Sequence, residues 1–131
     1  MSILDTATRQ PEKSDRKSVG RAGERAAAVF LVSQGYSVLD QNWHDGRRGE
    51  LDLVVERDGT VVFVEVKTRR WLPPEAALTA VDRQKLDRLR RLGLAWMRSH
   101  GGWRTCRFDI LGVGLREGRE PLFAWLQDVA Q

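Results

Sequence analysis

The strongest apolar pattern in the chain spans residues 51–67, where two runs rich in Val, Leu and Phe flank a short polar segment. We expect strands at residues 51–56 and 60–67, because β-branched and aromatic residues favour strands. Arg57-Asp58-Gly59 is the expected turn between them, since Asp-Gly readily adopts the left-handed backbone of a tight hairpin. Both strands are apolar enough to lie in the middle of a sheet.

Two longer segments repeat their apolar positions at helical spacing, which predicts two helices. The first is expected to be apolar almost all round and well buried, and the second to have one core face. The first covers about residues 19–34, and Gly35 is its expected C-terminal stop. The second covers about residues 82–99 and ends before Gly101-Gly102. Its expected core face consists of Leu86, Leu89, Leu92, Gly93, Trp96 and Met97.

Further strands are expected at residues 36–42, 105–115 and 122–127, and a short helix is the alternative for the last of these. Residues 68–78 are expected to be irregular, because Pro73-Pro74 disfavours regular structure. The order is then helix, three strands, helix, two strands. This order predicts an α/β fold in which helices cover the faces of a mixed central sheet.

Composition narrows the class of protein further. The 131 residues suffice for one domain, expected at residues 19–131, while the polar and aperiodic residues 1–18 predict a disordered tail. No apolar run is long enough to span a membrane, so no membrane partner is expected. The single cysteine, Cys106, is typical of the reducing cytoplasm. A net charge of +4 mildly favours a polyanionic partner.

Charged residues interrupt the apolar hairpin at Asp52, Glu65 and Lys67. Glu65 and Lys67 share a strand face, because residues two apart in a strand point to the same side. Burying such groups is costly unless they are paired or bound to a metal. Asp52 and Glu65 come from adjacent strands and offer the oxygen ligands that Mg²⁺ or Mn²⁺ prefers. Such an ion would polarise a phosphodiester and activate a water, and Lys67 would stabilise the developing charge.

Charged residues also stand at unusual places outside the two central strands. Glu24 lies on a stripe of small residues in the first helix, where the alternative role is a favourable interaction with the helix dipole. Lys85 falls inside the apolar stripe of the second helix, so its side chain either extends to solvent or points into a site. Glu50 shares a strand face with Asp52, and its role as a ligand, a helper or a rim acid stays open.

Basic residues indicate where a polyanion would bind. Arg69-Arg70-Trp71 follows the second strand of the hairpin, and its arginines are expected to hold phosphates. Trp71 either stacks on a base or packs on the fold. The second helix carries a further set of arginines, for which solvation of an outer helix face is the more common explanation. These are Arg83, Arg88, Arg90, Arg91 and Arg98.

Several of these segments together resemble a nuclease signature. Asp52, followed by Glu65-Val66-Lys67 at the end of an apolar strand, resembles the motif of the PD-(D/E)XK nuclease superfamily. More narrowly, the chain resembles the YraN family, which is similar to archaeal Holliday junction resolvases. The matching segments are residues 20–24, 35–36, 49–53 and 63–69, Lys85, and Arg107-Phe108-Asp109.

The resemblance implies a fold and a set of site residues. The fold is a restriction-endonuclease-like αβββαβ core with a mixed central sheet flanked by helices. Asp52 and Glu65 would be the ligands of Mg²⁺ or Mn²⁺, Lys67 the catalytic lysine, and Glu24 a catalytic acid carried by the first helix.

The expected function is that of a metal-dependent endonuclease acting on DNA, including branched or junction DNA. Arg69, Arg70 and Lys85 are the expected substrate-binding residues. A homodimer fits such a substrate, because a four-way junction requires paired cuts. The alternative is a nucleic-acid-binding module that keeps the nuclease fold with little or no catalytic activity. A third hypothesis is a buried ion-pair network that binds no ligand.

Overall fold

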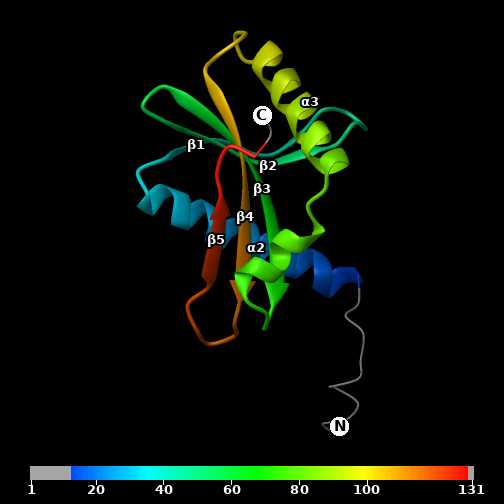
Figure 1. Ribbon diagram of the computed structural model, residues 1–131, viewed down its shortest axis with the longest axis vertical. Coiled ribbons are helices and arrows are strands. Elements are labelled where there is room, and N and C mark those ends of the chain that lie inside the picture. Colours follow the sequence, from blue (N-terminus) through cyan, green and yellow to red (C-terminus); the bar gives the residue numbers. More distant parts are fainter. Residues whose placement is uncertain (1–12, 130–131) are drawn as a thin grey trace, which may run out of the picture.

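A mixed five-stranded sheet forms the centre of the computed structural model, which describes residues 13–129 (Figure 1). The strand order is β1-β2-β3-β4-β5, and all neighbours are antiparallel except β3 and β4, which are parallel. The elements are α2 (Lys13–Ser33), β1 (Ser37–His44), β2 (Glu50–Arg57), β3 (Thr60–Arg70), the 3₁₀ helix η1 (Pro74–Ala80), α3 (Arg83–Ser99), β4 (Cys106–Leu115) and β5 (Leu122–Leu126). This confirms the predicted α/β class and the restriction-endonuclease-like αβββαβ order.

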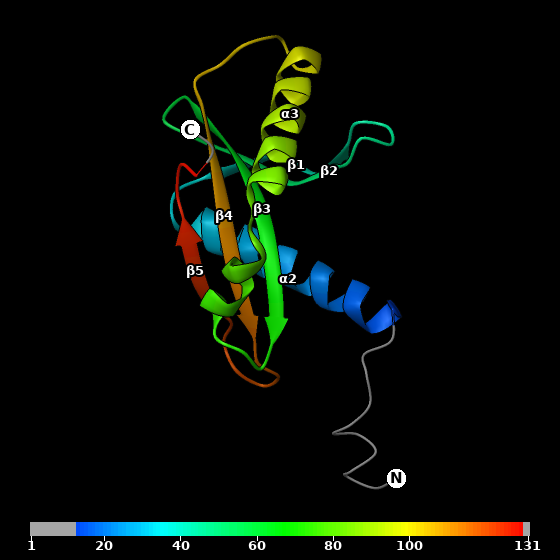
Figure 2. The ribbon, with the colours of Figure 1, turned by 45° about the vertical axis from the view of Figure 1, so that its right-hand side comes forward.

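The helices α2 and α3 cover opposite faces of the sheet, with α3 in front and α2 behind in Figure 1 and both visible from the side in Figure 2. Leu31 of α2 belongs to a core cluster with Val64, whereas Trp96 of α3 belongs to a second cluster with Phe63. Phe63 and Val64 are neighbours in β3 and point to opposite faces, as strand alternation requires. The buried residues of α3 are Leu89, Leu92, Gly93, Trp96 and Met97, which confirms most of the predicted core face.

Local sequence signals fix the end of α2 and the central hairpin. Gly35 has a φ of 92°, and the N–H of Tyr36 donates to the carbonyl of Leu31 at 3.1 Å, which is the Schellman arrangement of a helix C-terminus. Asp58 and Gly59 have φ values of 51° and 82°, as a type I′ hairpin turn requires. Both predictions are therefore confirmed.

The first helix begins at Lys13, whereas the apolar periodicity places its start at Val19. Residues 15–18 are exposed, so this turn of helix carries no apolar pattern by which the sequence would reveal it. Asp15 lies in the first turn, where a carboxylate is favoured by the helix dipole. The prediction of a disordered tail is therefore wrong for residues 13–18, and its remainder, residues 1–12, lies outside the described residues.

The segment 68–78, expected to be irregular, is mostly regular. β3 continues to Arg70, because β4 pairs with it in parallel from Val61–Cys106 to Arg70–Leu115. After a bend, η1 begins at Pro74, a position where the missing N–H of proline costs no helical hydrogen bond. Between them Trp71 has a φ of 61° and is 58% exposed, so it does not pack in the core.

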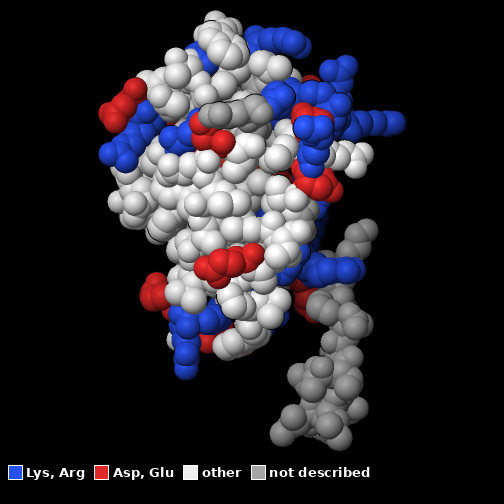
Figure 3. Space-filling view, in the orientation of Figure 1, with Lys and Arg blue, Asp and Glu red and all other residues white. Residues whose placement is uncertain are grey.

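Charged side chains are distributed unevenly over the face shown in Figure 3. Lys and Arg gather along the right-hand edge of the view, where the lower part of α3 and the β1–β2 loop lie in Figure 1. Within residues 13–129, no helix combines the length and the apolar content needed to cross a membrane.

Candidate functional site

The hairpin of β2 and β3 opens at Asp52. Antiparallel pairing runs from Arg57–Thr60 to Leu53–Val64 and ends there. Beyond this point the side chain of Asp52, rather than the backbone of β2, accepts a hydrogen bond from β3. Its Oδ2 accepts the N–H of Val66 at 2.8 Å. β3 meanwhile continues beside β4, so β2 diverges from it and the Asp52 carboxylate lies in the opening.

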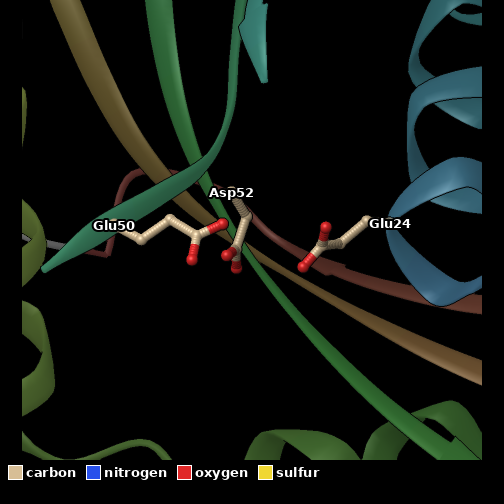
Figure 4. Close-up of side chains that lie close together, drawn as sticks. All are labelled: Glu24, Glu50 and Asp52. Carbon is tan, nitrogen blue, oxygen red and sulfur yellow. The ribbon is translucent and has the colours of Figure 1, made fainter. Parts of the chain in front are cut away.

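Carboxylates from two elements meet at this opening. Glu24 comes from α2, while Glu50 and Asp52 come from β2, and in Figure 4 all three side chains point toward a common centre. Each offers one carboxylate oxygen, and these oxygens lie within 4.8 Å of one another. All three residues are half-buried. The group contains Glu24 and Asp52 of the predicted site and adds Glu50, whose role the sequence leaves open.

Asn42 of β1 links the two outer carboxylates. Its Nδ2 donates to Oε2 of Glu24 at 2.7 Å and to Oε1 of Glu50 at 2.6 Å. The backbone of Asn42 is left-handed, with a φ of 49°, a conformation that asparagine tolerates better than most residues. Sequence reasoning missed this residue, because an exposed asparagine at the end of an expected strand carries no distinctive signal.

The environment of Asp52 raises the pKa of its carboxyl to about 8. Burial is the largest cause, followed by the negative charge of Glu65, with smaller contributions from Glu24 and Glu50. The hydrogen bond from the N–H of Val66 acts in the opposite direction. A hard divalent cation fits this donor set, because it prefers carboxylate oxygens and would offset their mutual repulsion. Its binding would displace the proton that the raised pKa retains at neutral pH.

Glu65 is engaged by two cations. Its Oε1 lies 3.1 Å from Nζ of Lys67 and 3.5 Å from Nη2 of Arg88. The Glu65 side chain is only 12% exposed and that of Lys67 20%, so the pair is partly shielded from water. Among residues 13–129, the cluster of three carboxylates does not include Glu65. Its role as a metal ligand therefore stays a prediction, although its charge acts on Asp52.

The helical spacing predicts that Arg88 lies outside the apolar stripe of α3, so its contact with Glu65 is a second feature that the sequence does not reveal. Lys85 is half-buried in the first turn of α3, where its backbone N–H donates to Oδ1 of the N-cap residue Asp82 at 2.9 Å. Its predicted substrate role stays a prediction.

Two grooves meet at Glu24. One has a volume of about 580 Å³ and extends toward β1 and β2, with Asn42 and Glu50 in its wall. The other has a volume of about 560 Å³ and extends along the end of β3. Basic side chains line both grooves. The first groove contains Lys17, Arg21 and Arg25. The second contains Arg16, Lys67, Arg69 and Arg70. We call Glu24, Glu50 and Asp52 the acidic cluster. Positively charged side chains thus border this cluster, and Arg69 and Arg70 lie beside Lys67.

Arg107 and Asp109, which belong to a segment that resembles the YraN family, form a separate network. Nε and Nη2 of Arg107 donate to the two oxygens of Asp109 at 2.9 and 3.0 Å, and Nη2 also donates to the hydroxyl of Tyr36 at 2.8 Å. Nε1 of Trp125 donates to Asp109 Oδ2 at 2.9 Å. Asp109 is fully buried, and its hydrogen bonds raise the pKa of Arg107 above its usual value. This pair joins β4 to its surroundings rather than lining the acidic cluster.

Fold and site together define an α/β protein with a restriction-endonuclease-like core, whose sheet opens at a cluster of carboxylates beside a lysine. The family model described as "Uncharacterised protein family UPF0102" matches residues 23–113. The chain belongs to this family, the YraN family of the PD-(D/E)XK-like nuclease superfamily, as the resemblance implied.

Individual relatives agree with this assignment. A UPF0102 protein of Nocardia farcinica is 38% identical over 127 residues, which cover 96% of this chain and 99% of the relative. A UPF0102 protein of Streptomyces coelicolor is 43% identical over 118 residues, which cover 88% and 90% of the two chains. A third, of Trichlorobacter lovleyi, is 42% identical over 109 residues, with 80% and 84% covered.

Proposed function

We propose that the protein is a metal-dependent endonuclease that hydrolyses phosphodiester bonds in DNA. The observation that carries the proposal is the convergence of Glu24, Glu50 and Asp52 where β2 leaves β3, with Lys67 in the adjoining groove. Oxygen ligands for a hard cation and a nearby ammonium group are the components that phosphoryl-transfer chemistry needs. Membership of a PD-(D/E)XK-like superfamily supports the same reaction class.

Mg²⁺ or Mn²⁺ is the proposed cofactor. Glu24, Glu50 and Asp52 would hold the ion, and Glu65 is a candidate further ligand because its charge acts on Asp52. When bound, such an ion supplies Lewis-acid polarisation of the phosphodiester and lowers the pKa of a bound water.

The residues of the chain would hold and orient these groups. Asn42 fixes the two outer carboxylates, and the N–H of Val66 fixes that of Asp52. Glu65 holds the ammonium group of Lys67 at 3.1 Å, which keeps it beside the groove. From there Lys67 would stabilise the negative charge that develops on the phosphodiester in the transition state.

The basic walls of both grooves support DNA as the substrate, because arginine and lysine position a nucleic acid through its phosphates. Arg69, Arg70 and Lys85 are the proposed contacts. Branched or junction DNA and a homodimeric enzyme extend this proposal. The proposed compartment is the cytoplasm, where Cys106 would remain reduced.

Cleavage assays test the proposal. Labelled duplex, flap and four-way junction DNA are incubated with the protein in Mg²⁺, Mn²⁺ or EDTA. We expect ion-dependent cleavage that falls at least about 100-fold in Asp52→Ala and in Lys67→Ala, a loss typical of removing one transition-state interaction. Asp87→Ala, which removes an exposed acid from α3, is the matched control and should cut like the wild type. Intact DNA across the whole panel, with a folded protein that binds Mn²⁺, would refute the proposal, and retained DNA binding would then indicate a binding module.

A further inference from the structure

A third groove lies between α3 and the β1–β2 loop, apart from the acidic cluster. It has a volume of about 510 Å³, and its wall carries four arginines against a single acid, Asp45. The arginines are Arg48 from the loop and Arg88, Arg91 and Arg98 from α3. We call it the arginine groove. It lies at the edge where basic side chains gather in Figure 3.

The arginines of α3 form a stripe along the helix. At about 100° per residue, Arg88, Arg91 and Arg98 fall within about 80° of the helix circumference. The stripe is about 15 Å long at 1.5 Å per residue. This length corresponds to about four nucleotides of a DNA strand at 3.4 Å each. The spacing therefore suits consecutive phosphates rather than one small anion.

Two of these arginines are available to a ligand. Arg91 and Arg98 are exposed, and no ion pair is found for either within residues 13–129. Arg48 lies 3.8 Å from Asp45, and the Arg48 side chain is 83% exposed, so this ion pair is weak. Arg48 also comes from a different element, so the groove gathers positive charge from two parts of the fold. A solvated outer helix face does not account for that convergence.

Arg88 connects the arginine groove to the candidate active site. It lines the groove and also lies 3.5 Å from Oε1 of Glu65. The lining of the groove also includes Leu92, Leu94 and Ala95, apolar side chains against which sugar rings would pack. A nucleic acid lying in the groove would therefore approach the acidic cluster from the α3 side.

We propose that the arginine groove binds the phosphate backbone of the nucleic acid on which the acidic cluster acts. In this arrangement Arg91 and Arg98 contact those phosphates of the substrate that lie outside the groove containing Lys67. This inference rests on the proposed function for the identity of the ligand. It adds a second contact surface, on the face of the sheet covered by α3.

Equilibrium binding of a fluorescein-labelled DNA duplex, measured in EDTA over a range of salt concentrations, tests the inference. We expect Arg91→Gln/Arg98→Gln to weaken binding by at least about tenfold. The slope of log K against log salt should fall by about two, because each phosphate contact contributes about 0.9. Arg83→Gln/Arg90→Gln is the matched control, since it removes the same charge from α3 outside the groove. It should retain the wild-type slope, and thermal unfolding should show that both variants are folded.

Equal effects of the two double variants would overturn the inference, because they would reflect net charge alone. Unchanged binding in Arg91→Gln/Arg98→Gln, or no binding by the wild type, would overturn it as well. Failure of the proposed function has a different signature. If the wild type binds DNA through the arginine groove but cuts no DNA in Mg²⁺ or Mn²⁺, the endonuclease proposal is refuted and the binding role of the arginine groove is retained. Cleavage that depends on Asp52, together with unchanged DNA binding in Arg91→Gln/Arg98→Gln, supports the nuclease and overturns the role of the arginine groove.

Discussion

Asn42 donates from its side-chain amide to two carboxylates that come from different elements, Glu24 on α2 and Glu50 on β2. It thereby holds two like charges close together, which would otherwise repel each other. Such hydrogen bonds to the ligands of a metal typically affect metal affinity by ten- to a hundredfold. Asn42 is therefore the residue through which the geometry of the acidic cluster is tested most directly.

We expect Asn42→Gly to weaken Mn²⁺ binding by about tenfold, measured by calorimetry at constant pH. Glycine removes the amide but adopts the left-handed backbone at this position without strain, so the fold should be preserved. Gln41→Ala is the control, because Gln41 lines the same groove and is exposed. Unchanged Mn²⁺ affinity in Asn42→Gly would contradict the role assigned to Asn42 and favour a site built on Asp52 and Glu65 alone.

The sequence points to some residues of the site and not to others for a physical reason. Asp52 and Glu24 are conspicuous because each interrupts an apolar or small-residue pattern, where a charge is costly. Asn42 and Arg88 occupy positions where polar residues are ordinary, a strand end and an outer helix face. Their roles arise only when the fold places β1 beside the acidic cluster and α3 beside Glu65, and that placement depends on the tertiary fold.

The close crossing of α2 over β3 sets the position of Glu24. A Cβ atom added at Gly23 would collide with the side chain of Thr68. The helix can therefore lie against the strand only because residue 23 has no side chain. Glu24, the next residue, is then held near Asp52 and Lys67.

Gly23→Ala should destabilise the fold by about 1–3 kcal/mol, because overpacking forces α2 away from β3. Adding Thr68→Ala removes Oγ1 and Cγ2 and should restore part of this loss, which a double-mutant cycle of urea unfolding would detect. Gly20→Ala is the control on the same helix, since nothing lies within 4 Å of its added Cβ. It should stabilise the protein by about 0.5–1 kcal/mol. Equal effects of Gly23→Ala and Gly20→Ala would show that the crossing is not tight.

The helices and strands also differ in how well the sequence predicts their boundaries. The strand β2, the hairpin turn after it and α3 follow from apolar periodicity and from Asp-Gly and Gly-Gly signals, so their predicted extents agree closely with the structure. The start of α2 and the length of β3 do not follow from such signals. An exposed helical turn needs no apolar residue, and β3 extends beyond its apolar run because β4 supplies hydrogen bonds as far as Arg70. Boundaries set by a distant partner are not encoded locally.

Across the whole molecule, the acidic residues beside the grooves and the fully buried Asp109 lie in different environments. Half-buried acids lie where β2 and β3 separate, and the two basic grooves that α2 lines border them. The arginine groove, which α3 lines, lies apart from these acids. The one fully buried carboxylate among the described residues, Asp109, lies in none of these grooves. Its oxygens accept from the side chains of Arg107 and Trp125 and from the backbone N–H of Asp128. It therefore ties the C-terminal part of the chain to β4.

This arrangement predicts that Asp109 supports folding rather than metal binding. Asp109→Asn should lower the free energy of unfolding by about 3–5 kcal/mol, because it leaves the guanidinium of Arg107 without its charge partner. Trp125→Phe removes one donor and should cost only about 1 kcal/mol. Urea unfolding measures both losses, and calorimetry at a temperature where the variants remain folded should give wild-type Mn²⁺ affinity. A variant of normal stability with weakened Mn²⁺ binding would instead assign Asp109 to the metal site. The distinction matters because Arg107-Phe108-Asp109 is one of the segments through which the chain resembles the YraN family. Resemblance alone does not separate residues that build the sheet from residues that act on a substrate.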